Sequence, residues 1–310
     1  MPEVRRMITL WQGSCNQWDC DEMGHMNVRV YAEKQMEGLA AFTHDLKLSH
    51  AFKPDSPSTI IPVDQHIRFI REVLAGHPLI MQGCVLEVGE CDALIYQELR
   101  HSDGALAAAF RVRVLHVDTV VREPFAWSKR TRKAFEDFMG AAPEESAPRS
   151  IDASAPTTPA GDMSMERIRT IGAPLVGKGS VPPSHMDVHG HMAPFWITGR
   201  VSDSVPNLLY NWRKEVAGEL RIGGAALEHR IRYHAMPQVG DRFEMYTSFG
   251  AAAGKTHSLI HWLMNPDSGR PWASVEVTAI ALDLDARKAV PAPPEMIAKL
   301  SELAPPGLKL

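Results

Sequence analysis

A nine-residue stretch near the start of the chain brings together side chains that could do acid–base or nucleophilic chemistry. Residues 19–27 read Asp-Cys-Asp-Glu-Met-Gly-His-Met-Asn. The Asp21 carboxylate could attack a carbonyl carbon directly or take a proton from an attacking water. His25 and Asn27 could donate hydrogen bonds to the carbonyl, to the water or to Asp21. Gly24 would let the backbone approach a ligand closely.

Each of these residues also has a structural interpretation. An aspartate just before a helix is often its N-cap, and a helical pattern begins right after Asn27. His25 could serve only to hold the turn, and Tyr31 could simply pack on a sheet. The pattern by itself favours a cap for Asp21, so the choice depends on the rest of the chain.

The chain repeats this motif in its second half. Residues 184–192 read Ser-His-Met-Asp-Val-His-Gly-His-Met, and Asp187 and His191 stand 166 positions after their counterparts in the first motif. Asn27 becomes Ala193 at the same offset. Further matches at offsets of 164 to 166 keep their order, as two copies of one domain would. We expect an altered second motif and one competent site that draws on both copies.

The second motif could also suggest a metal site, because His, Asp, His and His alternate over residues 185–191. The first copy has no matching set, so we expect neither a metal nor a cofactor. None of the four cysteines pairs at the spacing of a zinc knuckle. Reduced thiols are the expected state.

The elements that must position the first motif follow from hydrophobic periodicity. An alternating run at 7–18 predicts a strand that enters the motif, and apolar residues at helical spacing predict a helix from Val28 to Phe42. Four antiparallel strands and a closing helix, with Ser128 as its N-cap, complete the copy. The strands are expected at 59–73, 79–89, 93–101 and 106–118, and the closing helix at 128–139.

The second copy is expected to repeat this order with one interruption. Pro206 lies within its long helix, and the segment 203–207 should break that helix. A last helix is expected at about 293–303. A helix lying across one face of an antiparallel sheet makes each copy an α+β unit.

The two copies are separated by a stretch of different composition. Residues 141–165 are rich in proline, serine and alanine and show no periodicity, which predicts a flexible linker. We therefore predict a first domain at 1–140 and a second at 166–310.

The first motif resembles the hotdog-fold thioesterases, especially the 4-hydroxybenzoyl-CoA thioesterase-like group. That group carries the pattern Asp-x-Asp-x-x-Gly-(His)-(hydrophobic)-Asn at the end of a strand, and residues 19–27 match it. Acyl-carrier-protein thioesterases of plant type are similar too, with Asp-x-Asn-x-His, but here Met23 replaces the asparagine. The resemblance implies two tandem hotdog domains, each an antiparallel sheet wrapped around a long central helix.

The resemblance also implies an activity, the hydrolysis of an acyl thioester of coenzyme A or acyl carrier protein. Asp21 would be nucleophile or general base, and N–H groups at the start of the helix would bind the oxyanion. The resemblance implies Asp21 as the catalytic carboxylate. From their types and places we add His25 and Asn27 as candidate catalytic residues, and Gly24, Tyr31, Asp187 and His191 as candidate substrate-binding residues.

Two other functions remain open at this point. A hotdog hydratase or dehydratase would show Asp-x-Asn-Pro-x-His, with five positions from Asp to His, whereas both copies here have four and no proline. A non-catalytic acyl-thioester binding protein would need the motif only for structure. In that case both copies should retain it equally, and they do not.

Composition excludes several broad classes. With a net charge of −4 the chain has no basic footprint for nucleic acid and no polybasic membrane signal. Residues 1–6 are not followed by the apolar segment of a signal peptide, and no apolar run is long enough to span a membrane. We expect a cytoplasmic protein, and a homo-oligomer is compatible with the repeat.

Overall fold

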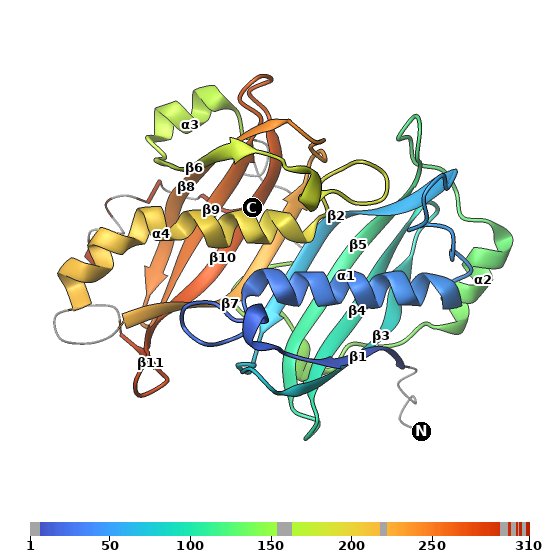
Figure 1. Cartoon of the computed structure of the whole chain (residues 1–310), viewed down its shortest axis with the longest axis horizontal. Helices are drawn as coiled ribbons and strands as arrows, with labels where there is room; N and C mark the ends of the chain where they lie inside the picture. The colour runs from blue at the N-terminus through green and yellow to red at the C-terminus, as the bar shows by residue number, and fades with distance from the viewer. Residues whose placement is uncertain are drawn as a thin grey trace. The chain divides into compact units, whose positions relative to one another are not determined.

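The chain forms two compact units. The computed structural model describes residues 7–153, 163–217, 222–291, 297–298, 302, 304–305 and 308–310. One unit comprises Met1–Ala147 with Asp187–Gly190, and the other Pro148–Met186 with His191–Leu310. In each, a long helix lies across one face of an antiparallel sheet (Figure 1).

The sheet of the first unit has the strand order β1-β3-β4-β5-β2, and all neighbours are antiparallel. The five predicted strands are therefore confirmed. β2 ends four residues before its predicted end, because Ile70 and Arg71 both donate their N–H groups to the Ala107 carbonyl and turn the chain away. The bounds are Ile8–Ser14 for β1, Ser58–Phe69 for β2, Pro78–Val88 for β3, Asp92–His101 for β4 and Leu106–Asp118 for β5.

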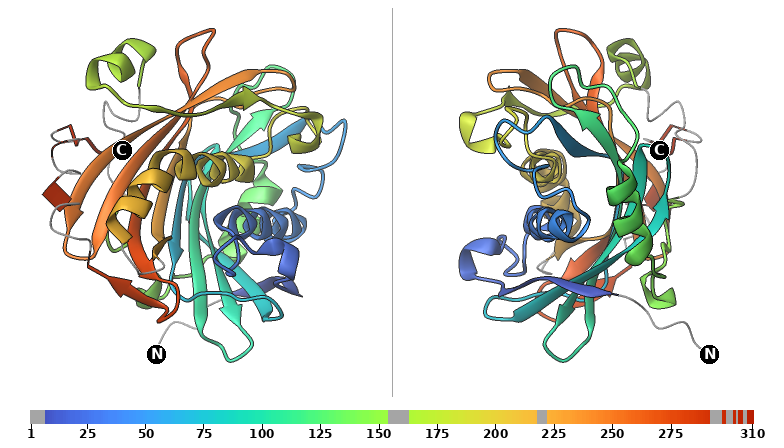
Figure 2. Two further views of the ribbon diagram at one scale, coloured as in Figure 1. Left: turned by 60° about the vertical axis from the view of Figure 1, so that its left-hand side comes forward. Right: turned by 90° about the vertical axis from the view of Figure 1, so that its right-hand side faces the viewer.

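Helix α1, Val28–Asp45, packs its apolar face on this sheet. The strands of the first unit curve around the helix, which is seen nearly end-on in the right-hand view of Figure 2. Leu39 and Phe42 are almost fully buried and pack in one core cluster with Ile95 of β4. The approach is close, since a Cβ at Gly38 would come within 2.5 Å of the Met81 sulfur. The second half of the helix is thereby held against the strands.

A row of three buried glutamines also joins α1 to the sheet. Gln35 of α1 donates to Gln97 of β4 and accepts from Gln65 of β2, at 3.1 Å for the second bond. All three side chains are at most 3% exposed. Buried amides are costly unless they are hydrogen-bonded, so this row favours one register of helix on sheet.

The closing helix α2, Lys129–Asp137, begins as predicted, because the Ser128 side chain accepts a hydrogen bond from the Thr131 N–H. The chain after α2 runs back along the first unit and includes the short helix η2, Glu144–Ser146.

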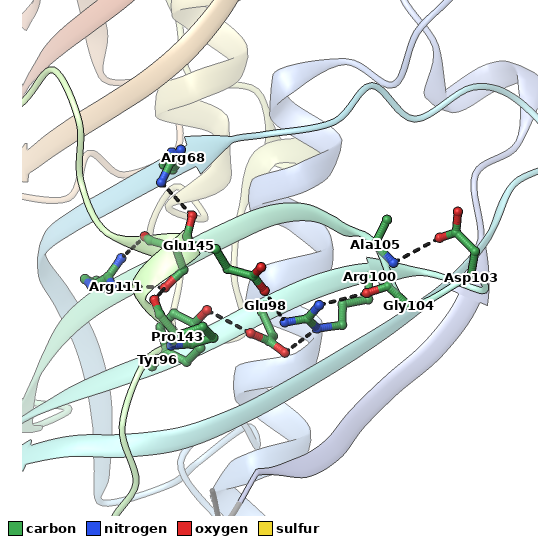
Figure 3. A network of polar contacts seen from close by, with 11 residues as sticks. Arg68, Tyr96, Glu98, Arg100, Asp103, Gly104, Ala105, Arg111, Pro143 and Glu145 are labelled. Carbon is green, nitrogen blue, oxygen red and sulfur yellow. Dashed lines mark hydrogen bonds and ion pairs between the residues drawn. The ribbon is translucent and has the colours of Figure 1, made fainter.

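Arginines on the strands hold this segment by its carbonyl groups (Figure 3). Arg68 of β2 donates to the carbonyl of Glu145 at 2.7 Å, and Arg111 of β5 donates to that of Ser146 at 2.7 Å. Arg100 of β4 contacts the Glu145 carboxylate at 3.1 Å and also pairs with Glu98, which is 1% exposed. The composition of residues 141–165 predicts a flexible linker. The described residues of this stretch make specific polar contacts, which its apolar content does not indicate.

The second unit repeats the architecture, with the strand order β7-β10-β9-β8-β6 and with β11 paired to β10. The short helix α3, Met165–Ile171, precedes its first strand. The other bounds are Leu175–Ser180 for β6, Phe195–Ala217 for α4, Ile222–Tyr233 for β7, Arg242–Ala253 for β8, Thr256–Met264 for β9, Pro271–Asp283 for β10 and Lys288–Val290 for β11.

The predicted break in the second long helix is wrong. Helix α4 runs without interruption from Phe195 to Ala217 and contains Pro206. A proline removes one backbone donor from a helix, but the flanking turns are held from the side. Val201 and Ser204 are each 4% exposed, and Asn207 donates to the Val176 carbonyl at 2.8 Å. These tertiary contacts offset the local cost.

No helix within the described ranges is long and apolar enough to cross a membrane. The last predicted helix, 293–303, falls largely on residues outside these ranges.

Candidate active site

The first motif folds into a small hairpin just ahead of α1. Its two sides are joined by hydrogen bonds from the Asp21 N–H to the His25 carbonyl and from the Asn27 N–H to the Asp19 carbonyl, both at 2.9 Å. Gly24 closes the turn through a bond from its N–H to the Asp21 carbonyl at 3.0 Å, with a φ of 78°. That left-handed conformation favours glycine. The hairpin sets Asp21 and His25 side by side.

A segment after β2 secures the other side of this hairpin. The Met26 N–H donates to the Val73 carbonyl at 2.8 Å, and His25 forms a bridge with Leu74. Met26 itself is buried, at 2% exposure. Because of this pairing, Glu72 lies next to His25, although the two residues are 47 positions apart.

His25 lies between two carboxylates. Its Nε2 is 3.1 Å from Asp21 Oδ2, and its Nδ1 is 3.0 Å from Glu72 Oε1. The side chains of His25 and Asp21 are only 15% and 11% exposed, while that of Glu72 is 33% exposed. The second oxygen of Asp21 accepts the Met23 N–H at 2.9 Å. The three side chains form what we call the carboxylate–histidine clamp.

The clamp favours the protonated imidazole. Burial acts to lower the pKa of His25, but the hydrogen bonds and negative charges of Asp21 and Glu72 act against it and prevail. The pKa of His25 is therefore raised above its ordinary value. As an imidazolium, His25 has an N–H for each carboxylate.

Glu72 was missed in the sequence. Nothing in its own neighbourhood singles it out, since it follows a strand and lies far along the chain from the motif. Comparison of the two copies could have pointed to it. The Met192 N–H donates to the Pro237 carbonyl in the second unit as the Met26 N–H does to the Val73 carbonyl in the first, so position 236 corresponds to position 72. Met236 then stands where the first copy has Glu72.

Asn27 is the N-cap of α1. Its side-chain oxygen accepts the Arg29 N–H at 2.9 Å, and its carbonyl accepts the Val30 N–H at 2.8 Å. Two of the N–H groups that could bind an oxyanion are thus engaged by Asn27. Val28 is the first residue of the helix, a position whose N–H has no acceptor within an α-helix.

Tyr31 lies one turn into α1, inside the core. It is 5% exposed, and its ring meets that of Phe69 edge to face at 5.1 Å between centroids. Burial raises the pKa of the Tyr31 hydroxyl, so the group stays protonated and can serve only in hydrogen bonds. Its packing on β2 matches the structural interpretation, and its role as a substrate contact stays a prediction.

The second motif repeats the hairpin but not the clamp. Asp187 accepts the His189 N–H at 2.9 Å, as Asp21 accepts that of Met23, and Gly190 has a φ of 77°. His191 forms a bridge with Gln238, as His25 does with Leu74. Methionine at 236 has no carboxylate to offer this histidine, so the second copy lacks one of the two acids.

The sequence raised the question of a metal site mainly at the histidine-rich second motif, where we expected none. Across the described part of the chain, no group of three or more His, Cys, Asp or Glu side chains is placed to hold a metal ion.

Comparison with known families agrees with this architecture. A family model described as the thioesterase-like superfamily matches residues 15–135 and 181–300, which together make up most of the chain. The chain belongs to this superfamily. This thioesterase-like protein is a thioester hydrolase, and the family model matches it in two successive segments. No curated protein matches its sequence.

Solved structures show the same fold over 89% of this chain. An acyl-ACP thioesterase from Bacteroides thetaiotaomicron is 14% identical, with 89% of this chain and 98% of that one covered and a TM-score of 0.63. A 12:0-ACP thioesterase from Umbellularia californica is 10% identical, with 89% and 94% covered and a TM-score of 0.65. The thioesterase-like protein thus has the α+β fold of two tandem hotdog domains.

Proposed function

We propose that this protein hydrolyses acyl thioesters of coenzyme A or acyl carrier protein at the first motif, with Asp21 as nucleophile or general base. The observation that carries the proposal is the carboxylate–histidine clamp, which is complete in one copy and lacks an acid in the other. A purely structural motif would have no reason to differ in this way. Two solved structures of the same fold are acyl-ACP thioesterases, which favours carrier-protein thioesters among the substrates to test.

The chemistry requires an oxygen that attacks the acyl carbon. Each oxygen of the Asp21 carboxylate accepts one hydrogen bond and retains a further lone pair. By direct attack it would form a mixed anhydride and expel the thiolate, and water would then cleave the anhydride. As a general base it would instead take a proton from the attacking water.

The leaving thiolate requires a proton, and His25 is the proposed donor. Its pKa is raised by Asp21 and Glu72 against the effect of burial, so the imidazolium persists to a higher pH than usual. Transfer of its Nε2 proton to the thiolate sulfur leaves neutral His25 and a free thiol. Glu72 holds the Nδ1 side of the ring during this step.

The proposed oxyanion donor is the Val28 N–H. Arg29 and Val30, the next two residues, already bond to Asn27, and the N-terminus of an α-helix carries a partial positive charge. A donor aimed at the developing oxyanion is worth roughly 10²–10³ in rate. Asn27 contributes by fixing the start of the helix.

Thiol release from a panel of acyl-CoA and acyl-ACP substrates tests the proposal. We expect Asp21→Asn to lower kcat by roughly 10²–10⁴, the range of a positioned base. Asp187→Asn is the matched control, because Asp187 makes the equivalent hairpin bond in the second copy. It should retain kcat, and any loss should appear in KM.

Both variants are first checked for native circular dichroism and an unchanged urea midpoint. Equal losses of kcat in the two variants would contradict a single site at the first motif. Absence of thiol release by the wild type from every substrate would favour a binding protein instead.

A further inference from the structure

Two thiols lie beside the active-site hairpin. The sulfur of Cys15, just after β1, is 3.8 Å from the sulfur of Cys20, which immediately precedes Asp21. Both sulfurs also approach the Asn16 carbonyl, at 3.6 and 3.5 Å. Cys15 is 1% exposed, whereas Cys20 is half-buried. The two side chains therefore face each other, and one of them is open to solvent.

The backbone holds one thiol more firmly than the other. Cys15 donates its N–H to the His77 carbonyl at 3.0 Å and accepts the Gly76 N–H at 2.8 Å. Cys20 belongs to the hairpin and forms a bridge with Met26. A disulfide needs about 2.05 Å between sulfurs, so closing the gap of 3.8 Å would draw the side chain of Cys20, the residue next to Asp21, toward the firmly held Cys15.

We propose that Cys15 and Cys20 form an oxidation site at which a hydroperoxide closes a disulfide that displaces Asp21 and suppresses hydrolysis. The suppression rests on the proposed function of Asp21, but the disulfide itself does not. Disulfides in cytosolic proteins are usually transient and redox-sensing, and a sensor needs an accessible thiol next to a resolving one.

The chemistry proceeds in two steps. The Cys20 thiolate attacks one peroxide oxygen, the O–O bond breaks, and Cys20 becomes a sulfenic acid while hydroxide leaves. The Cys15 sulfur then attacks the Cys20 sulfur, the S–O bond breaks, the disulfide forms, and water is released. Overall the two thiols lose two electrons, and hydrogen peroxide is reduced to two waters.

The environments of the two thiols determine which of them reacts first. Burial raises the pKa of the Cys15 thiol to about 12, with further contributions from the hydrogen bond and negative charge of Cys20. Cys15 therefore stays protonated and reacts second, after the more accessible Cys20. Oxidation of Cys20 to a sulfenic acid removes its thiolate charge, which eases deprotonation of Cys15.

The second copy supplies native replacements for both thiols. Val181 occupies the place of Cys15, since its N–H donates to Asp241 and its carbonyl accepts the Gly240 N–H, both at 2.9 Å. Met186 occupies the place of Cys20 and bridges to Met192. Cys15→Val and Cys20→Met therefore place side chains that the same backbone already carries.

The test compares wild type, Cys15→Val, Cys20→Met and the control Cys91→Ser under a hydrogen peroxide titration. Free thiols are then alkylated, and the tryptic peptide 7–29, which holds both cysteines, is analysed by mass spectrometry. We expect this peptide to lose two hydrogen atoms and to resist alkylation in the wild type and in Cys91→Ser. Activity, followed by loss of thioester absorbance, should fall at least tenfold and return with dithiothreitol.

Neither Cys15→Val nor Cys20→Met should show this reversible loss of activity. Absence of the lighter peptide in the wild type would overturn the proposal. A cross-linked peptide with unchanged activity would overturn the displacement of Asp21. A reduced wild type inactive on every thioester would refute the proposed function instead, and the peptide mass would still decide whether the disulfide forms.

Discussion

Removing the carboxylate of Glu72 tests the clamp most directly. Glu72→Met removes both the charge and the acceptor beside His25 Nδ1, and it places there the residue that the second copy carries at 236. Glu72→Gln removes only the charge and keeps an acceptor. The pair of variants therefore separates the electrostatic role of Glu72 from its hydrogen bond.

The size of the effect follows from the exposure of the contact. A hydrogen bond to a charged group contributes about 1.5–3 kcal/mol, and the lower end applies because Glu72 is 33% exposed. At about 1.36 kcal/mol for each factor of ten, Glu72→Met should lower the ratio of imidazolium to imidazole, and with it kcat on the alkaline limb, roughly tenfold. Charge-assisted bonds are about twice as strong as neutral ones, so Glu72→Gln should lower it roughly threefold.

The pH profile should move in a defined direction. Burial lowers the pKa of His25, and Asp21 and Glu72 together raise it above its ordinary value. Removing Glu72 removes one of the raising influences, so the imidazolium is lost at a lower pH. The alkaline limb of kcat should therefore begin at lower pH in both variants, and further down in Glu72→Met.

Thioester hydrolysis over a pH series measures both effects, and proton NMR of the His25 ring measures its titration directly. Glu22→Gln is the control, because it removes the same charge from an exposed position in the same hairpin. It should change kcat less than about twofold, as expected for an exposed charge. A wild-type kcat and an unmoved alkaline limb in Glu72→Met would refute the clamp as a catalytic device.

Two further predictions concern stability. Because the folded pKa of His25 is raised, its contribution is fully present below the unfolded value of about 6.5 and is lost as pH rises through the folded value. In urea unfolding, the free energy of unfolding of the wild type should exceed that of His25→Gln by more at acid pH than at alkaline pH. A difference that stays constant with pH would contradict this. Gln35→Leu leaves Gln65 and Gln97 short of a partner and should cost about 1–3 kcal/mol at neutral pH, whereas an unchanged urea midpoint would show that the row is dispensable.

The local elements could be read from the sequence because their signals are local. Alternation marked the strands of the first unit, and helical spacing after Asn27 marked α1. Ser128 was identified as a cap from its type and place alone. The repeat at offsets of 164 to 166 indicated two copies, and the family match over residues 15–135 and 181–300 confirms it.

The rule that proline ends a helix was wrong where tertiary contacts oppose it. Pro206 should end a helix by its own chemistry, but burial of the neighbouring turns and the bond from Asn207 keep α4 continuous. The stretch 143–147 lies in the predicted linker, and its carbonyl groups accept hydrogen bonds from Arg68 and Arg111, contacts that its own composition does not indicate. Both sets of contacts join residues that lie far apart along the chain, and a local sequence pattern does not include them.

The candidate site also combines residues that the sequence could predict with one that it could not. The spacing of four positions between Asp21 and His25, around a glycine suited to a turn, could be read from the sequence, and the structure gives that glycine a positive φ. Glu72, 47 positions after His25, joins the clamp only through the tertiary fold, because the pairing of Met26 with Val73 brings the two segments together. A backbone pairing of this kind depends on how two distant segments align, and the types of the residues in one motif do not encode that alignment.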